Sequence, residues 1–250
     1  MLRTMGTALG QTLIVMPAYN ESQSVGRVVS ETRAILPDIT VLVVDDGSTD
    51  GTADAARAAG ALVATLPFNL GVGGAMRVGF RYAAQHGYRA VVQIDADGQH
   101  DPATVTGLLD RLEDYDIVIG ARFAGEGAYV MSGPRRWASK VLAWTISRTA
   151  GTKLTDTTSG FRASGPRAIE LFEREYPAEY LGDTIESLVL ACRAGLTATQ
   201  VPTAMRDRSG GAPSHSPLRA AVYLARATLA LLFAYARPKA VAPRTIEATA

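Results

Sequence analysis

Two acidic side chains stand one residue apart in the segment Asp95-Ala96-Asp97, directly after the apolar stretch 90–94. Carboxylates at this spacing, just beyond a strand, can face a common point. Hard oxygen ligands of this kind suit Mg²⁺ or Mn²⁺ that bridges phosphate oxygens. Such an ion would neutralise the charge that builds on a departing diphosphate. A solvated turn is the alternative, because Asp97-Gly98 is also a turn signal.

A second acidic pair, Asp45-Asp46, follows the apolar stretch 41–44 and precedes Gly47. An aspartate here can accept the imide N–H of uracil or thymine, or the N–H groups of guanine. The alternative is a turn that caps a helix, because the next residues, Ser48 to Asp50, all favour the capping position.

The first apolar stretch, 12–16, leads into Pro17-Ala18-Tyr19-Asn20-Glu21. The ring of Tyr19 could lie against a base or ribose, and Glu21 could accept ribose hydroxyls. A turn started by Pro17 and feeding a capped helix is the alternative interpretation.

The segment 69–74, which begins at Asn69 and includes Gly73, resembles part of a dinucleotide-binding fingerprint. The last glycine of G-x-G-x-x-G falls on Met76, however, and the segment belongs to the third strand–helix unit rather than the first. These two departures exclude a Rossmann dehydrogenase. The glycines either let the backbone approach a ligand closely or form a tight turn.

Four arginines in the second half of the chain fall in predicted loops or at the ends of predicted elements: Arg122, Arg135, Arg162 and Arg208. A departing diphosphate or a phosphorylated acceptor would require guanidinium groups of this kind. For each one taken alone, a solvated surface position is the alternative.

Short β-branched stretches alternate with helical segments, which predicts an α/β fold. Strands are expected at 12–16, 41–44, 61–66, 90–94, 117–119 and 197–201. Helices are expected from a serine cap at 22 or 24 to about 36, and over 53–59, 73–86, 135–149 and 183–194, with Asp101 capping another. Strands separated by helices imply βαβ units with ligands beyond the carboxyl ends of the strands.

The bulk composition sets further limits. A length of 250 residues fits one large domain, and a net charge of +1 argues against a dedicated nucleic-acid binder. The single cysteine, Cys192, excludes an internal disulfide and suits a reducing compartment. Neither a secretory signal nor a spanning apolar stretch is found, so we expect a cytoplasmic protein.

The C-terminal part predicts an amphipathic helix over 218–237. Arg219, Arg226 and Arg237 fall within about 20° of one another on a helical wheel, with leucines opposite. A basic stripe backed by an apolar face suits the inner surface of an anionic membrane. Packing on the helix's own domain and docking on a small membrane-protein partner remain open alternatives.

Seven segments stand in the order found in family 2 glycosyltransferases, across residues 13–211: PAYNES, VVDDGSTDGT, FNLGVGGA, QIDADGQHDP, IGARF, DTTSGFR and VPTAMRDRSGG. The chain most resembles the dolichol-phosphate mannose synthase and polyprenyl-phosphate glycosyltransferase branch. The resemblance implies a GT-A fold, a Rossmann-like sheet flanked by helices, and inversion at the anomeric carbon. The domain would span 11–211, between a flexible 1–10 and a loop and amphipathic helix over 212–237, with 238–250 as a flexible tail.

The resemblance also implies roles for individual residues. The nucleotide would be held by Pro17, Ala18, Tyr19, Glu21, Asp46, Gly47, Asn69, Gly73, Asp95 and Ala96. The metal, Mg²⁺ or Mn²⁺, would be held by Asp95, Asp97 and Gln99. Catalysis would involve Asp97, the phosphate-handling Arg122, Arg135 and Arg208, and Asp183 and Glu186 on the acceptor side. A sugar hydroxyl acceptor would need one of these last two carboxylates as a base, although both also suit a helix N-terminus.

The resemblance implies a UDP-, GDP- or dTDP-linked sugar donor and a polyprenyl-phosphate or cell-envelope glycan acceptor. One departure bears on the substrates: mannose synthases continue as R-x-x-G-x-S-K, whereas Ser214 stands at the lysine position here. Transfer to a small soluble acceptor and a non-catalytic nucleotide-sugar-binding protein are alternatives. A sugar-nucleotide pyrophosphorylase is another, but it would carry a Gly-rich loop where PAYNE stands.

Overall fold

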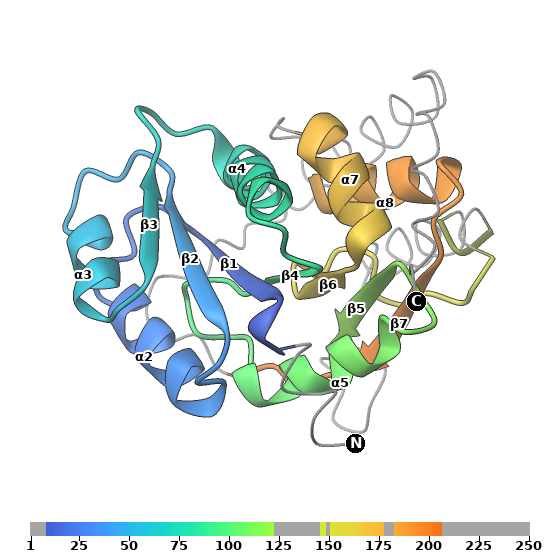
Figure 1. Cartoon of the computed structure of the whole chain (residues 1–250), viewed down its shortest axis with the longest axis horizontal. Helices are drawn as coiled ribbons and strands as arrows, with labels where there is room; N and C mark the ends of the chain where they lie inside the picture. Colours follow the sequence, from blue (N-terminus) through green and yellow to red (C-terminus); the bar gives the residue numbers. More distant parts are fainter. Residues whose placement is uncertain (1–8, 123–145, 149–150, 178–182, 207–250) are drawn as a thin grey trace, which may run out of the picture.

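Seven strands form one sheet in the computed structural model, which describes residues 9–122, 146–148, 151–177 and 183–206. The strands are β1 (Thr12–Ala18), β2 (Thr40–Asp45), β3 (Leu62–Thr65), β4 (Ala90–Gln93), β5 (Ile117–Ala121), β6 (Arg162–Ser164) and β7 (Ala198–Pro202). Their order across the sheet is β3-β2-β1-β4-β6-β5-β7 (Figure 1). All neighbouring pairs are parallel except the two that β6 makes.

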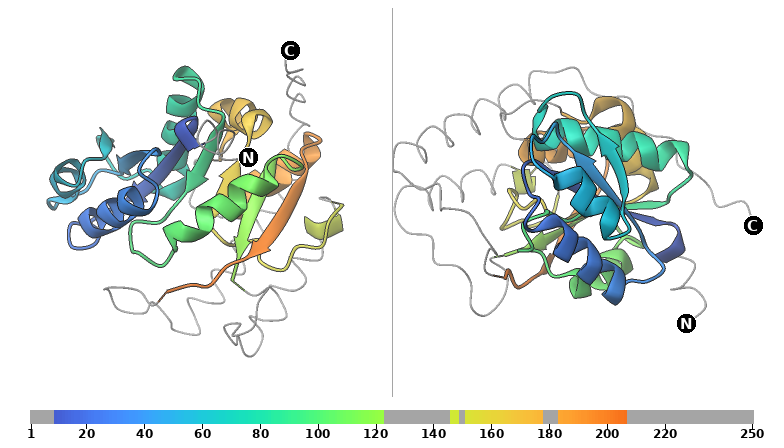
Figure 2. Two further views of the ribbon diagram at one scale, coloured as in Figure 1. Left: turned by 60° about the horizontal axis from the view of Figure 1, so that its bottom comes forward. Right: turned by 90° about the vertical axis from the view of Figure 1, so that its left-hand side faces the viewer.

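Helices cover both faces of the sheet (Figures 1 and 2). One face carries α4 (Gly71–Gln85), α7 (Pro166–Glu175) and α8 (Asp183–Arg193). The other carries α2 (Val25–Ile35), α3 (Thr52–Ala58), the short 3₁₀ helix η1 (Pro102–Thr104) and α5 (Val105–Arg111). The sheet is therefore the middle of three layers.

The alternation of side chains along β1 shows how this arrangement follows from the sequence. Leu13 and Val15 pack in the cluster that includes α4, α7 and α8, whereas Ile14 and Met16 pack in the cluster that includes α2 and α5. Successive side chains of a strand point to opposite faces. A strand covered on both faces therefore needs an uninterrupted apolar run, which β1 has.

The predicted α/β organisation is confirmed, and so is the position of each predicted strand. Gly60 and Gly87, which directly follow the predicted helices 53–59 and 73–86, adopt positive φ values of 86° and 72°, a conformation that glycine reaches without steric cost. The Asp101 carboxylate caps η1 by accepting the N–H of Ala103 at 3.0 Å. The Ser24 hydroxyl does not cap α2; it instead donates to the Glu21 carboxylate at 2.5 Å.

Strand β6 and helix α7 were not predicted. β6 is three residues long, begins with the charged Arg162 and pairs antiparallel with both β4 and β5. So short a strand with a charged residue shows no periodic apolar pattern. Its insertion separates β5 from β4 and makes the sheet mixed.

Several predictions lie outside the described residues: Arg135, Arg208, the amphipathic helix over 218–237 and both terminal segments. Of the helix expected over 135–149, residues 146–148 are described, and they are helical. Among the described helices, none combines the length and the apolar character that crossing a bilayer requires.

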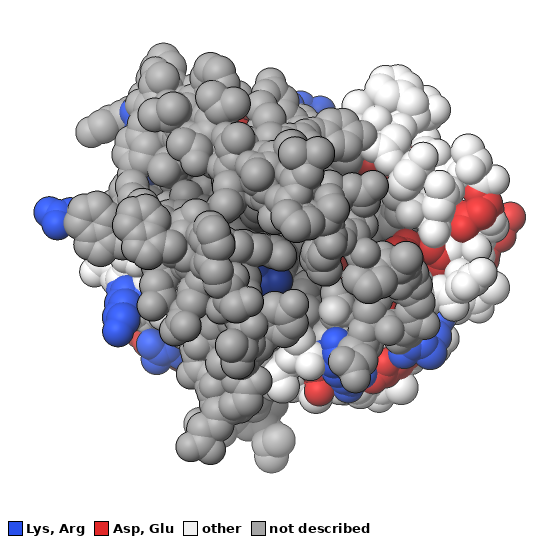
Figure 3. Space-filling view, turned by 180° about the vertical axis from the view of Figure 1, so that it is seen from behind, with Lys and Arg blue, Asp and Glu red and all other residues white. Residues whose placement is uncertain are grey.

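Charges on the described surface are mixed in sign. On the face shown in Figure 3, basic and acidic side chains lie interspersed along the lower right of the molecule. Ion pairs of this surface include Arg27–Glu31 at 3.7 Å and Arg111–Asp114 at 3.9 Å.

Candidate active site

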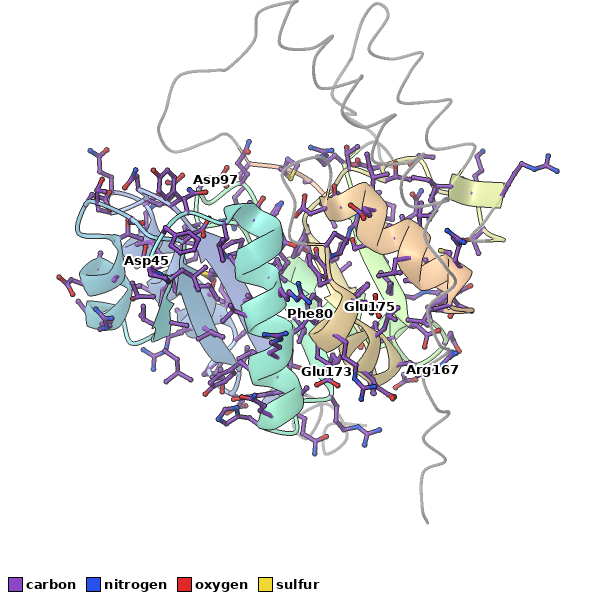
Figure 4. All side chains as sticks on the ribbon, turned by 90° about the horizontal axis from the view of Figure 1, so that it is seen from above. Asp45, Phe80, Asp97, Arg167, Glu173 and Glu175 are labelled. Atoms are coloured by element: carbon purple, nitrogen blue, oxygen red, sulfur yellow. The ribbon has the colours of Figure 1, made fainter. Side chains whose placement is uncertain are left out.

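The predicted site residues gather at the carboxyl edge of the sheet. The register pairs Ala18 with Asp45 and Val15 with Gln93, so the loops after β1, β2 and β4 leave the sheet at the same edge. Figure 4 shows Asp45 and Asp97 at this edge. These three loops therefore share the edge of the sheet at which the sequence predicts ligands to bind.

The loop after β1 is fastened to the loop after β2 through Asn20. Its N–H donates to the Ser48 hydroxyl, and its side-chain oxygen accepts the N–H of Thr49, both at 2.9 Å. Asn20 has a φ of 55°, a conformation that asparagine tolerates better than most residues. Next to it, Tyr19 is 47% exposed, so its ring is accessible to a ligand at the sheet edge.

Two carboxylates of these loops accept hydrogen bonds from neighbouring residues. Glu21 donates its N–H to the Thr52 hydroxyl at 2.9 Å, and its carboxylate accepts from Ser24. Burial alone would raise the pKa of Asp50, but hydrogen bonds from Thr52 and Ser22 outweigh it and lower that pKa to about 2. These bonds hold the two loops in one arrangement before any ligand binds.

The Asp46 carboxylate holds the start of α4. It accepts the N–H of Leu70 and the N–H of Gly71, each at 2.7 Å, and the residue is 3% exposed. Burial raises the pKa of Asp46, and the neighbouring Asp45 adds to this, while the two backbone hydrogen bonds oppose it. Both Asp46 oxygens accept backbone N–H groups, so this carboxylate positions the start of α4 and does not offer two free oxygens to a base.

Asp45, at the end of β2, was not among the predicted nucleotide-binding residues. Its Oδ1 accepts the N–H of Ser48 at 3.1 Å, and Oδ2 makes no hydrogen bond within the described part of the chain. Asp45 and Asp46 are equally buried, at 3% exposure each, but only Asp45 keeps an oxygen that no described hydrogen bond occupies. The acidic pair alone did not show this difference between its two members.

The glycines of these loops let chain segments pack closely. A Cβ on Gly47, whose φ is 72°, would lie 2.6 Å from the carbonyl carbon of Phe68. A Cβ on Gly73 would lie 2.4 Å from the carbonyl oxygen of Pro177. The Asn69 side chain accepts the N–H of Gly71 at 3.1 Å. The structure adds a third reason for glycine in these loops, namely close packing against the protein itself.

The acidic turn after β4 has both carboxylates partly exposed. The side chain of Asp95 is 39% exposed, and Oδ1 of Asp97 accepts the N–H of Gln99 at 3.0 Å. Ala96, between them, is buried and anchors the turn in the core. The carboxylates thus reach the surface from a fixed backbone.

Asp95 is enclosed on its protein side by Gln93, His100 and Gly160. The Gln93 amide donates to Asp95 Oδ1 at 3.1 Å. His100 Nδ1 accepts the N–H of Asp95 at 3.0 Å, and His100 Nε2 lies 3.7 Å from Asp95 Oδ2. A Cβ on Gly160 would stand 3.5 Å from both carboxylate oxygens, so glycine leaves space there.

The chain beyond β7 supports the acidic turn from outside. The N–H of Arg206 donates to the Gln99 carbonyl at 3.0 Å, and Met205 forms an antiparallel bridge with His100. The Arg206 guanidinium pairs with Asp101 at 2.8 Å and with Glu31 of α2. The turn is therefore held on both of its sides.

Arg122, which follows β5, forms a bidentate ion pair with Asp156. Its Nε and Nη2 lie 2.7 and 2.8 Å from the two carboxylate oxygens, and Nη2 also donates to the Thr158 hydroxyl at 2.8 Å. Burial alone would raise the pKa of Asp156, but the hydrogen bonds and charge of Arg122 outweigh it and hold that pKa below its usual value. The aspartate fixes the direction of the guanidinium, a role that the sequence did not reveal.

Arg162 is 7% exposed, and its guanidinium is occupied by the protein. It donates to the carbonyl oxygens of Ser159, Thr184 and Thr157 at 2.8, 2.6 and 2.7 Å. The sequence left two interpretations of Arg162, a solvated surface position and a ligand of the diphosphate. The observed contacts fit neither of them. It joins β6 to the start of α8.

The two predicted acceptor-side carboxylates differ in surroundings. Glu186 is 4% exposed, on the buried face of α8. Asp183 begins α8, and its buried Oδ2 has no hydrogen-bond partner among the described residues. Burial raises the pKa of Asp183, and the nearby charge of Asp95 raises it further. The effect of Asp95 indicates that Asp183 lies near the acidic turn.

The profile of the family described as glycosyl transferase family 2 matches residues 13–172. The chain belongs to glycosyltransferase family 2. It is 33% identical over 213 residues to an undecaprenyl-phosphate mannosyltransferase of Micrococcus luteus, covering 80% of this chain and 86% of that protein. It is 30% identical over 232 residues to a polyprenol monophosphomannose synthase of Mycolicibacterium smegmatis, covering 85% and 84%.

Solved structures show the same fold for this family 2 glycosyltransferase. Glucosyl-3-phosphoglycerate synthase from Mycobacterium tuberculosis, in complex with Mn²⁺, UDP-glucose and phosphoglyceric acid, matches with a TM-score of 0.68 and 23% identity. The match covers 95% of this chain and 85% of that one. The predicted GT-A fold is confirmed, and with it the prediction of a glycosyltransferase of the polyprenyl-phosphate branch.

Proposed function

We propose that this glycosyltransferase moves a sugar from a nucleoside-diphosphate donor to polyprenyl phosphate, with inversion at the anomeric carbon, at the inner surface of the membrane. The observation that carries the proposal is the partly exposed pair Asp95 and Asp97 at the same sheet edge as Asp45. The acceptor is supported by the relatives from Micrococcus luteus and Mycolicibacterium smegmatis, whose names specify undecaprenyl phosphate and polyprenol.

The donor nucleotide would lie along the loops after β1 and β2. Tyr19 offers an exposed ring for the base or ribose, and Asp45 offers an acceptor for a base N–H. Asp46 and Gly47 would hold the adjoining loops and α4 in position, because their contacts are to the backbone at 68–71. Recognition of the nucleoside would thus fall to the first half of the sheet.

The acidic turn fits a divalent cation bound together with the donor. The described residues contain no group of three His, Cys, Asp or Glu side chains that could hold an ion. Mg²⁺ is commonly bound by one or two carboxylates plus substrate phosphates, and Asp95 and Asp97 supply that number. When bound, the ion would neutralise charge on the departing diphosphate. We therefore expect Mg²⁺ or Mn²⁺ to bind weakly unless a nucleoside diphosphate is present.

A lipid phosphate is already an anion, so its attack on the sugar requires no general base. The chain's task is then to align the acceptor oxygen opposite the departing diphosphate and to offset the negative charges. Arg122 suits the second task because Asp156 and Thr158 fix its guanidinium at the end of β5. Arg135 and Arg208, outside the described residues, are proposed to assist.

Calorimetry tests the donor site. UDP, GDP and dTDP are titrated into the protein with and without Mn²⁺, and we expect one of them to bind, more tightly when the ion is present. Failure of all three to bind would contradict the proposal. Transfer of labelled sugar to polyprenyl phosphate in detergent, compared with transfer to soluble sugars, then tests the acceptor.

The variant Asp97→Ala tests the role of the acidic turn. We expect transfer to be abolished while the thermal unfolding midpoint changes little, because the Asp97 side chain is partly exposed. Asp114→Ala, which removes an exposed carboxylate just after the end of α5, is the matched control. Full activity of Asp97→Ala would remove the proposed metal role.

A second candidate function is transfer to the hydroxyl of a soluble acceptor, with Asp183 as the base. It is favoured by Oδ2 of Asp183, which has no partner in the described part of the chain, and by the raised pKa that burial gives this carboxyl. General-base catalysis contributes on the order of 10²–10⁴-fold. A loss of kcat of that size in Asp183→Asn, with transfer to a hydroxyl, would favour this function over the lipid phosphate.

A further inference from the structure

His100 lies behind the acidic turn and contacts Asp95 with both ring nitrogens. The ring is 3% exposed and stacks on Phe161, with 4.8 Å between ring centroids and 17° between ring planes. Its backbone pairs with Met205 beyond β7. A side chain fixed on this many sides has little freedom to rotate, so it can serve as a rigid support.

The hydrogen bond from Asp95 determines which nitrogen of the ring carries the proton. His100 Nδ1 accepts the N–H of Asp95 at 3.0 Å, and an accepting ring nitrogen carries no proton, so the proton lies on Nε2. Nε2 is 3.7 Å from Asp95 Oδ2. That distance exceeds a hydrogen bond, so the N–H group acts on the carboxylate as a nearby positive dipole.

Each oxygen of Asp95 therefore has its own support on the protein side. The Gln93 amide donates to Oδ1 at 3.1 Å, and the His100 Nε2–H group lies near Oδ2. The space beside both oxygens is kept open by Gly160. With 39% of the side chain exposed, the carboxylate has an open side for an incoming group.

We propose that His100 is a positioning residue that fixes the backbone of Asp95 through Nδ1 and the direction of its carboxylate through Nε2, so that Asp95 is set for the divalent cation. This proposal rests on the proposed function. It assigns His100 no contact with substrate or ion. Groups that orient metal ligands in this way typically contribute 10–100-fold to metal affinity or activity.

Three substitutions distinguish the contribution of His100 Nδ1 from that of Nε2. His100→Phe keeps a ring that can stack on Phe161 but removes both contacts to Asp95. In His100→Asn, the side-chain amide reaches about as far as Nδ1 and can accept the Asp95 N–H. In His100→Gln, the amide reaches about as far as Nε2 and can face the Asp95 carboxylate. His86→Phe makes the same change at an exposed histidine and serves as the matched control.

The test is a titration of Mn²⁺, followed by electron paramagnetic resonance, into the full-length protein with UDP, GDP or dTDP. We expect about 10–100-fold weaker Mn²⁺ binding in His100→Phe, intermediate affinities in the Asn and Gln variants, and no change in His86→Phe. The apparent KM for Mn²⁺ in the transfer assay should rise in the same order, with the acceptor KM unchanged. A purely structural role would lower the thermal unfolding midpoint without changing Mn²⁺ affinity.

The controls separate this proposal from the proposed function. If Asp97→Ala loses Mn²⁺ binding while every folded His100 variant binds Mn²⁺ as tightly as the wild type, the positioning role is overturned and the metal site stands. If the wild type binds no Mn²⁺ with any of the three nucleotides, both fail. Should His100→Phe not fold, the Asn and Gln variants decide: weakened binding supports the role, and unchanged binding overturns it.

Discussion

Replacing Asp156 by asparagine tests how Arg122 is held at the end of β5. The Asp156 side chain is 1% exposed and accepts three hydrogen bonds from Arg122, from its backbone N–H, Nε and Nη2. Asparagine keeps the shape of the side chain but removes the charge and replaces one accepting oxygen by a donating NH₂ group. That group would face a guanidinium, which can only donate.

The expected cost follows from these contacts. Hydrogen bonds with an ionised partner are roughly twice as strong as neutral ones, and breaking a buried ion pair by removing one partner costs about 3–5 kcal/mol. The Arg122 side chain is 30% exposed, so water can compensate part of the loss. We therefore expect Asp156→Asn to lower the free energy of unfolding by about 2–3 kcal/mol. At this chain length that corresponds to a fall of about 4–12 °C in the melting temperature.

The lowered pKa of Asp156 also predicts how the stability loss of Asp156→Asn changes with pH. Because Arg122 holds the pKa of Asp156 below its usual value in the folded protein, the carboxylate adds stability fully above the unfolded value of about 3.9. That stability is lost as the pH falls through the lower, folded pKa. The difference between wild type and Asp156→Asn should therefore be constant from neutral pH down to about pH 5 and shrink below about pH 4.

Urea unfolding followed by circular dichroism, at pH 7 and in steps toward pH 3, measures these differences. Asp114→Asn is the matched control, because its partner Arg111 is 3.9 Å away and the Asp114 side chain is 71% exposed. An exposed pair of this kind contributes about 0–1 kcal/mol. A loss below about 0.5 kcal/mol in Asp156→Asn, or a loss that does not change with pH, would refute the reasoning.

Two other substitutions test the supports of the site. Gly47→Ala should cost about 2 kcal/mol or more in urea unfolding, because alanine disfavours the φ of 72° by about 1–2 kcal/mol and its Cβ would lie 2.6 Å from neighbouring backbone. Gly87→Ala has the same φ with nothing within 4 Å, so an equal loss in both variants would contradict the packing argument. Arg206→Ala removes the ion pairs to Glu31 and Asp101, and since the Arg206 side chain is 39% exposed we expect a loss of about 1 kcal/mol or less. That loss should diminish in 1 M NaCl, and a salt-independent loss would argue against ion pairing.

Structural features that depend on the local sequence pattern were predicted correctly. Apolar runs located the strands, and the acidic residues directly after them were assigned to the carboxyl edge, where Asp45 and Asp97 lie. Both depend on neighbours in the chain: a strand buried on two faces must be apolar, and the residues just beyond its end must lie at the edge of the sheet.

The failures concern partners that are distant in the sequence. Asp46 binds backbone 24 and 25 residues away, and Asp156 pairs with Arg122 across 34 residues. No periodicity indicates such contacts, so the sequence did not show that Asp46 binds the start of α4. The three-residue β6 was missed for the same reason, because its pairing with β4 and β5 determines it.

The position of β6 between β4 and β5 has a consequence for the order in which the molecule can assemble. Strands β1 to β4 and their helices are complete by residue 93, and their mutual contacts need nothing from the rest of the chain. The strands β5 and β7 can join this half only when residues 162–164 arrive, since Gln93 meets Arg162 across 69 positions. During synthesis, strands β1 to β4 would therefore form before β5 to β7, with one edge of β4 unpaired until β6 is made.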